Sequence, residues 1–139
     1  MSDQGTDRNV TTVRAVFRAA GEGDEAGMLR HLDPEIEWRP TGFLTGKRAY
    51  RGHDGIRQWI ADLEEVAGRG DTILTFPLEY RALDDDRVLV LGRGRLERKV
   101  SPIDQELGWV WELRDGKVIR MTNYLSHAEA RQAAGVGAE

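Results

Sequence analysis

The sequence predicts an α+β protein in which a curved antiparallel sheet forms a cone covered by three helices, with a short C-terminal helix. Two observations support this fold class. Apolar residues repeat at helical spacing in the first half of the chain, and four long strand-like runs fill most of the second half. Asp115-Gly116 separates the last two runs and is typical of a two-residue hairpin turn. Helices followed by consecutive strands indicate segregated α and β elements.

Three helices are expected before the long strands. Val10, Val13 and Phe17 form an apolar stripe that predicts a helix over residues 8–20, and residues 1–7 are expected to fray. A second, short helix follows Asp24, whose carboxylate can accept amide hydrogens of the first turn. A third helix is predicted over residues 54–67, where apolar residues recur three and four positions apart: Ile56, Trp59, Ile60, Leu63 and Val66.

Strands and one apolar loop account for most of the remaining chain. A short strand is predicted over residues 35–40, with Ile36 and Trp38 on its buried face. The loop over residues 41–52 contains apolar side chains, which suggests a flap over a site. Pro77 indicates a bulge or an edge strand. The long strands are expected over residues 72–83, 87–98, 105–113 and 117–125, and Ser126 with Glu129 forms a capping box that starts the tail helix.

Composition excludes several classes of protein. The chain has 139 residues, which predicts one domain over residues 1–139. It has no cysteine, which excludes disulfides, thiolate nucleophiles and Cys-ligated metals. A formal net charge of -4 argues against nucleic-acid binding. Neither a signal-peptide pattern nor a long apolar run is present, so a protein of the cytoplasm that does not enter the membrane is expected. The three scattered histidines predict no metal site, and no cofactor is expected.

Two tracts resemble the SnoaL-like group of the nuclear transport factor 2-like superfamily. They are YRGHDGIRQWIADL, residues 50–63, and LRDGKVIRMTNYLSHAEARQAAG, residues 113–135. The resemblance covers residues 8–135 and implies a helix-covered sheet around a deep apolar pocket, a small-molecule ligand and a homodimer formed through the outer sheet face. The superfamily includes ketosteroid isomerases, polyketide cyclases, epoxide hydrolases and non-catalytic binders, so function has to be argued from the site.

The resemblance allows one test for ketosteroid isomerase chemistry. That reaction needs a carboxylate base, with a tyrosine and a protonated aspartic acid to stabilise the oxyanion. At the corresponding positions this sequence has Arg39, Phe17 and Gly108. Because all three required side chains are missing, the sequence argues against isomerisation of this type.

His53 and Glu112 are the first two candidates for cofactor-free acid–base catalysis. A histidine can exchange protons near neutral pH, but His53 could instead only flank the start of a helix. Glu112 lies between apolar residues on a predicted central strand, where it could be a catalytic carboxylate. The alternative for Glu112 is a cross-strand salt bridge with Arg93 or Arg95.

Arg39 and Tyr124 complete the four catalytic candidates. Arg39 could clamp a carboxylate or phenolate of a ligand, since a guanidinium forms two parallel hydrogen bonds to such groups; it could equally point to solvent. Tyr124 could donate a hydrogen bond at the pocket mouth, or it could be a half-buried core residue.

Aromatic residues are the expected ligand contacts: Phe17, Trp38, Tyr50 and Trp59. Trp109 and Trp111 share one face of a strand, and alternation alone leaves open whether that face lines the pocket or the dimer interface. The predicted function is binding of a small apolar or cyclic metabolite in the cone, with polyketide-type cyclisation, isomerisation or epoxide hydrolysis as candidate reactions. The alternative is a non-catalytic ligand-binding or dimerisation module.

Overall fold

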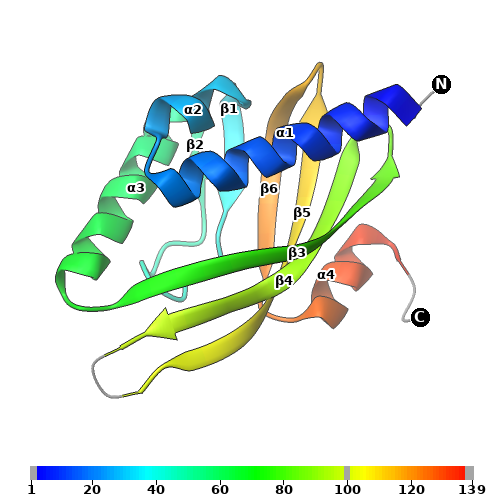
Figure 1. The fold of residues 1–139 in the computed structure, drawn as a ribbon. Helices are drawn as coiled ribbons and strands as arrows, with labels where there is room; N and C mark the ends of the chain where they lie inside the picture. The colour runs from blue at the N-terminus through cyan, green and yellow to red at the C-terminus, as the bar shows by residue number, and fades with distance from the viewer. Residues whose placement is uncertain (1–2, 99–100, 137–139) are drawn as a thin grey trace.

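Helices and strands mix in the first half of the chain, and strands dominate the second half (Figure 1). The computed structural model describes residues 3–98 and 101–136. The predicted α+β class is confirmed. In chain order the elements are α1 (Asp3–Glu22), α2 (Glu25–Arg30), β1 (Leu32–Arg39), β2 (Tyr50–Arg51), α3 (Gly52–Gly68), β3 (Thr72–Asp84), β4 (Arg87–Glu97), β5 (Ile103–Arg114), β6 (Lys117–Tyr124) and α4 (His127–Ala134).

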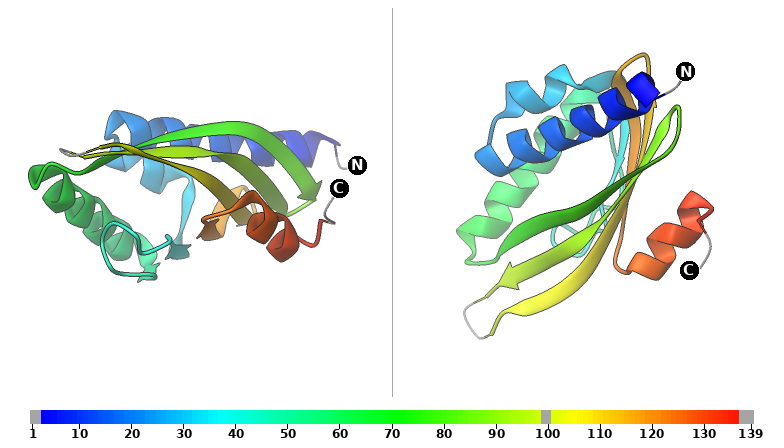
Figure 2. Two further views of the ribbon diagram at one scale, coloured as in Figure 1. Left: turned by 90° about the horizontal axis from the view of Figure 1, so that it is seen from below. Right: turned by 45° about the vertical axis from the view of Figure 1, so that its right-hand side comes forward.

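The six strands form one sheet in the order β2-β1-β6-β5-β4-β3. All neighbouring pairs are antiparallel except β1 and β6, which are parallel. The long strands bend along their length, and α1, α2 and α3 lie apart from α4 (Figure 2). The sheet is therefore curved and unclosed, as the cone prediction requires.

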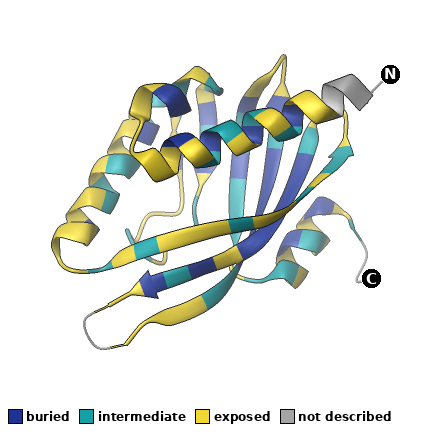
Figure 3. Cartoon of the chain, viewed as in Figure 1, coloured by how far each residue is buried: buried dark blue, intermediate teal, exposed yellow. Residues whose placement is uncertain are grey.

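Two apolar clusters lie on the two faces of the sheet, and the central parts of its strands are largely buried (Figure 3). The larger one joins α1, α2 and α3 to the inner face, with Val13, Ile56 and Trp111 fully buried. The smaller one packs Ala130 and Ala134 of α4 against the outer face of β4 and β5. Because both faces are covered, β4 and β5 are buried at nearly every position of their central parts. Among the described residues, no helix is long and apolar enough to cross a membrane.

Several local predictions are confirmed in detail. Asp115 and Gly116 have φ values of 54° and 78°, the left-handed geometry of the hairpin turn. Ser126 Oγ accepts a hydrogen bond from the Glu129 amide at 3.1 Å and so caps α4. Asp24 Oδ1 caps α2 in the same way, accepting from the Gly27 amide at 2.9 Å.

Pro77 lies both on an edge strand and at a bulge. β3 is the last strand of the sheet, and its pairing with β4 shifts between Pro77 and Glu79. Gly92 pairs with Pro77, and a Cβ atom at Gly92 would clash with the carbonyl oxygen of Phe76. The strands therefore come very close at this bend, which needs glycine.

Two predicted boundaries were wrong because contacts distant in the sequence extend the elements. α1 begins at Asp3 rather than at residue 8, and Asn9 Nδ2 ties its N-terminal half to Asp85 O at 2.7 Å. β1 begins at Leu32 rather than at residue 35, since Leu32 pairs with Val118 on β6. Leu32 therefore lies outside the short second helix, which ends at Arg30.

Candidate functional site

A cavity of about 790 Å³ lies between α1, α3 and the inner face of the sheet. Its walls come from α1, α3, the strands β3 to β6 and the loop over residues 40–45. We call it the main cavity. Its size falls within the range of small-molecule sites. Thr41, Phe43 and Leu44 line it, so the apolar loop that was expected to act as a flap does form one wall.

Aromatic rings make up much of the lining. Phe17 meets Trp109 and Trp111 edge to face, with ring centroids 4.9 Å and 5.2 Å apart. Trp38 meets Trp59 and Trp111 in the same manner, at 5.0 Å and 5.8 Å. All five residues line the main cavity. The open question about Trp109 and Trp111 is thus answered, since their strand face is the cavity face. Edge-to-face contacts hold such rings in fixed orientations and form a continuous apolar wall.

Three buried polar atoms lie among the side chains that line the main cavity. The indole nitrogens Nε1 of Trp38 and Trp111 and the Oδ1 atom of Asn123 have no hydrogen-bond partner among the described residues. An unpaired buried polar group costs about 1–3 kcal/mol. A ligand group that displaced the apolar neighbours of these atoms would find two donors and one acceptor.

Tyr80 supplies a further polar group at the side of the main cavity next to α1. Its ring stacks on Phe17 at 6.1 Å, and the Arg14 guanidinium carbon lies 4.0 Å from its centroid. Burial raises the pKa of the Tyr80 phenol, although the positive charge of Arg14 opposes this. The phenol therefore stays protonated at neutral pH and can donate a hydrogen bond. Among the described residues, no aspartate, glutamate or histidine lines this cavity.

His53 lies outside the main cavity lining, near the start of α3. Its Nε2 atom is 2.9 Å from the carbonyl oxygen of Leu32, and since a carbonyl only accepts, the imidazole must donate there. The contact fastens the start of α3 to the start of β1. This geometry favours the structural interpretation of His53 over the catalytic one.

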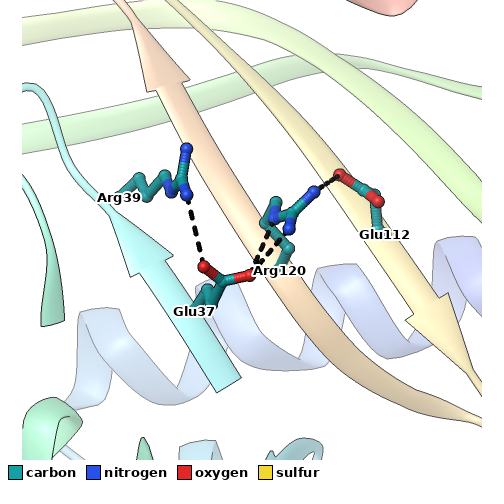
Figure 4. Close-up of polar contacts among 4 residues, drawn as sticks. All are labelled: Glu37, Arg39, Glu112 and Arg120. Carbon is teal, nitrogen blue, oxygen red and sulfur yellow. Dashed lines mark hydrogen bonds and ion pairs between the residues drawn. The ribbon is translucent and has the colours of Figure 1, made fainter. Parts of the chain in front are cut away.

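Glu112 and Arg39 lie on the outer face of the sheet, away from the main cavity (Figure 4). Glu112 Oε2 pairs with Arg120 at 3.3 Å, and Arg120 also binds Glu37 Oε1 at 2.7 Å. Arg39 contacts the other carboxylate oxygen of Glu37 at 3.2 Å. The cross-strand salt bridge expected for Glu112 is present, but its partner is Arg120 on β6 rather than Arg93 or Arg95 on β4.

Tyr124 and Tyr50 also lie away from the main cavity lining. Tyr124 packs against the outer apolar cluster beneath α4 and is a half-buried core tyrosine. Tyr50 is buried, and its hydroxyl donates to Asp62 Oδ2 at 2.6 Å. Of the residues expected to contact a ligand, the structure brings Phe17, Trp38 and Trp59 together in the main cavity and leaves Tyr50 out.

Two cavity residues were missed by the sequence analysis. Asn123 is a polar residue at a cavity-facing position of β6, two places after Met121, and its polarity on that face was an available signal. Tyr80 could not be placed by simple alternation from Ile73 and Thr75, because the bulge after Pro77 changes which residues face inward.

A second cavity of about 450 Å³ lies where β1 and β2 separate. Three arginines line it, Arg39, Arg48 and Arg51, together with one carboxylate, Glu37. Pro40 and Asn123 line both cavities, so the two are neighbours separated by the end of β1 and the loop that follows it.

Comparison with known proteins identifies the family. The model of the SnoaL-like domain matches residues 13–121. The chain belongs to the SnoaL-like domain family. A search of curated proteins found no significant match.

Solved structures similar to this SnoaL-like chain share its fold. TerC, co-crystallised with polyporic acid, has a TM-score of 0.74 and 23% identity, with 92% of this chain and 98% of TerC covered. A putative polyketide cyclase from Xanthomonas campestris pv. campestris has a TM-score of 0.72 and 17% identity, with 94% of this chain and 98% of that protein covered. An LEH-like epoxide hydrolase of M. tuberculosis has a TM-score of 0.65 and 17% identity, with 92% of this chain and 90% of that protein covered. The superfamily predicted from the two sequence tracts is confirmed.

Proposed function

We propose that this SnoaL-like chain binds a small, largely apolar cyclic metabolite in the main cavity. The observation that carries the proposal is the continuous wall of edge-to-face rings from Phe17, Trp38, Trp59, Trp109 and Trp111. A flat ligand of similar chemistry would replace water against this wall and gain about 25 cal/mol for each Å² of apolar surface buried.

The polar groups beside the wall favour a ligand that carries oxygen atoms. Asn123 Oδ1 and the two unpaired indole N–H groups are buried, so a ligand that displaced their apolar neighbours would find one acceptor and two donors. Tyr80 supplies a hydroxyl whose raised pKa keeps it protonated. Ketone, lactone, quinone or epoxide oxygens would accept from these donors. Such few polar groups in an apolar site fix orientation and selectivity.

Cofactor-free turnover of the same ligand is the second candidate function, and Tyr80 is the residue that favours it. A protonated phenol can stabilise a developing oxyanion by donating a hydrogen bond. Cyclisation, isomerisation or epoxide hydrolysis would also need a proton acceptor. None of the described lining residues carries a carboxylate or an imidazole, so the acceptor would have to be water or a group of the ligand. We therefore place binding before turnover.

A homodimer through the outer sheet face is also proposed. Phe76 and Leu78 on β3 are 46% and 70% exposed, which is unusual for large apolar side chains, and β3 is an edge strand of the sheet. Sedimentation velocity of the wild type and of Phe76→Arg tests this proposal. A wild-type monomer across the micromolar range would contradict it.

The binding experiment titrates the chain with cyclic ketones, lactones and epoxides, and with polyporic acid because TerC was crystallised with it. Trp59→Ala removes one wall of the main cavity and should weaken binding about tenfold or more, whereas Gln58→Ala, a neighbouring exposed residue on α3, should not. Equal affinity of Trp59→Ala and wild type for every ligand found would reject this cavity as the site. Chromatography of each ligand after incubation then separates binding from turnover.

A further inference from the structure

The second cavity is lined by three arginines, of which only Arg39 is paired with a carboxylate among the described residues. Arg39 comes from the end of β1, Arg51 from β2 and Arg48 from the loop between these strands. Three segments of chain thus contribute one arginine each to the lining of a single space of about 450 Å³. This concentration is notable in a chain whose formal net charge is -4.

The carboxylate in this cavity is already paired. Glu37 accepts from Arg120 at 2.7 Å and 3.1 Å and from Arg39 at 3.2 Å (Figure 4). These hydrogen bonds, those of Arg120 above all, hold the pKa of Glu37 below its ordinary value, so it is ionised at neutral pH. Among the described residues, no carboxylate lies within 4.0 Å of the guanidinium of Arg48 or Arg51. Three positive lining groups and one negative group leave a net charge of about +2.

The backbone register directs these groups to one side of the sheet. Arg51 pairs directly with Glu37 across β1 and β2, and Arg39 pairs with Thr122 across β1 and β6. Paired residues share a face, and so do residues two apart on a strand, so Arg39, Arg51, Glu37 and Thr122 all point outward. Arg48 lines the same space from the loop, and its side chain packs against Gly42, which lines the main cavity.

We propose that the second cavity binds a phosphate group, either free or carried by a larger molecule. A guanidinium matches the geometry of phosphate oxygens and can bind two of them at once. The net charge of about +2 matches a phosphate, which carries about -1.5 to -2 at neutral pH, better than it matches a single carboxylate. The Thr122 hydroxyl can supply a further donor.

The position of the second cavity suggests which molecule could carry the phosphate. Because Pro40 and Asn123 line both cavities, a cyclic ligand with a phosphate arm could place its ring in the main cavity and its phosphate against the arginines. This extension rests on the function proposed above, whereas phosphate binding itself does not.

The test is a titration of ¹⁵N-labelled protein with inorganic phosphate, followed by NMR. Phosphate should shift the amides of Arg39, Arg51 and Thr122. Arg48→Gln/Arg51→Gln should weaken phosphate binding about tenfold or more, since two charge-assisted contacts are lost. The control Arg81→Gln/Arg98→Gln removes two exposed arginines of other surface regions and should leave the affinity within about twofold. An unchanged fingerprint spectrum elsewhere shows that both variants fold.

Two further measurements test whether the site prefers the phosphate dianion. Phosphate should bind more weakly at pH 5 than at pH 7.5, because its second pKa is about 6 and the dianion fits the site better. Acetate at the same ionic strength should compete poorly. Two results would overturn the proposal. In the first, the amide shifts caused by phosphate disappear when chloride keeps the ionic strength constant during the titration. In the second, the same shifts persist in Arg48→Gln/Arg51→Gln.

Phenyl phosphate distinguishes the two sources of the group. If the ring occupies the main cavity, Trp59→Ala should weaken phenyl phosphate but leave inorganic phosphate unchanged. Equal affinities for both phosphates in both proteins indicate a site for free phosphate. Binding of inorganic phosphate to the second cavity is therefore tested independently of ligand binding in the main cavity.

Discussion

The two faces of strand β5 show how one segment serves two different environments. Trp109 and Trp111 point into the main cavity and pack against Phe17. Between and beside them, Val110 packs under α4, and Glu112 pairs with Arg120. Adjacent residues of one strand thus alternate between an aromatic wall and a surface of ion pairs.

The inner face is therefore suited to binding apolar surface, and the outer face is suited to recognising charge. The inner face offers rings and a few neutral polar atoms, whereas the acidic and basic groups on the strands that bound the cone lie on the outer face. Three of the four residues expected to be catalytic, Glu112, Arg39 and Tyr124, are on that outer face, and His53 is tied to the backbone of β1. Any acid–base chemistry in the main cavity would have to use other residues.

The largest contrast is expected for adjacent truncations on the two faces of β5. Trp111 is 1% exposed, and Trp111→Ala should lower the free energy of unfolding by about 3–5 kcal/mol. Glu112→Ala removes a half-exposed ion pair and should cost less than about 1 kcal/mol. Urea denaturation of both variants measures the difference, and losses of similar size would mean that the two faces do not differ as described.

Glycine substitutions probe the rigidity of the two faces. A Cβ atom at Gly108 would clash with the Cβ of Ala130, so Gly108→Ala must push α4 away from the sheet. A Cβ atom at Gly94 would meet the end of the Leu107 side chain at 2.6 Å, and that side chain can rotate. We expect a loss of about 1–3 kcal/mol for Gly108→Ala and a smaller one for Gly94→Ala. Thermal unfolding tests the order, and the reverse order would contradict it.

Much of the fold could be predicted because local chemistry and global structure agree. The Asp115-Gly116 turn, the Ser126 cap and the stripe of α3 each depend on residues close together in the sequence. The start of β1 at Leu32 depended instead on pairing with Val118, which lies 86 residues away along the chain, and no local pattern reports such a pairing.

The candidate site was harder to predict because a strand covered on both sides has no polar face. α4 buries Val110 on one side of β5, and the helices bury Trp109 and Trp111 on the other, so alternation could not say which side holds the ligand. The bulge after Pro77 then turns Tyr80 to the face opposite to the one that simple alternation gives. Deciding both required the three-dimensional arrangement of α4 and β3.

The smallest expected effect concerns the ion pairs of the outer face. Hydrogen bonds from Arg120 lower the pKa of Glu37 in the folded protein. A depressed folded pKa contributes stability above the unfolded value, and that contribution disappears as the pH falls through the folded pKa. Arg120→Gln should therefore lower the free energy of unfolding by up to about 1 kcal/mol near pH 7, and the gap should close as the pH falls below the ordinary range of a glutamate pKa.

Urea denaturation at several pH values measures this gap between the wild type and Arg120→Gln. Arg69→Gln is the control because it removes a more exposed pair with Glu65, which is 75% exposed, and should give a smaller gap at neutral pH. A gap for Arg120→Gln that stays constant down to pH 3 would mean that Arg120 stabilises the fold by packing on its neighbours. The outer face would then be organised by contact area, as the inner face is, and its charges would remain available for an anionic ligand.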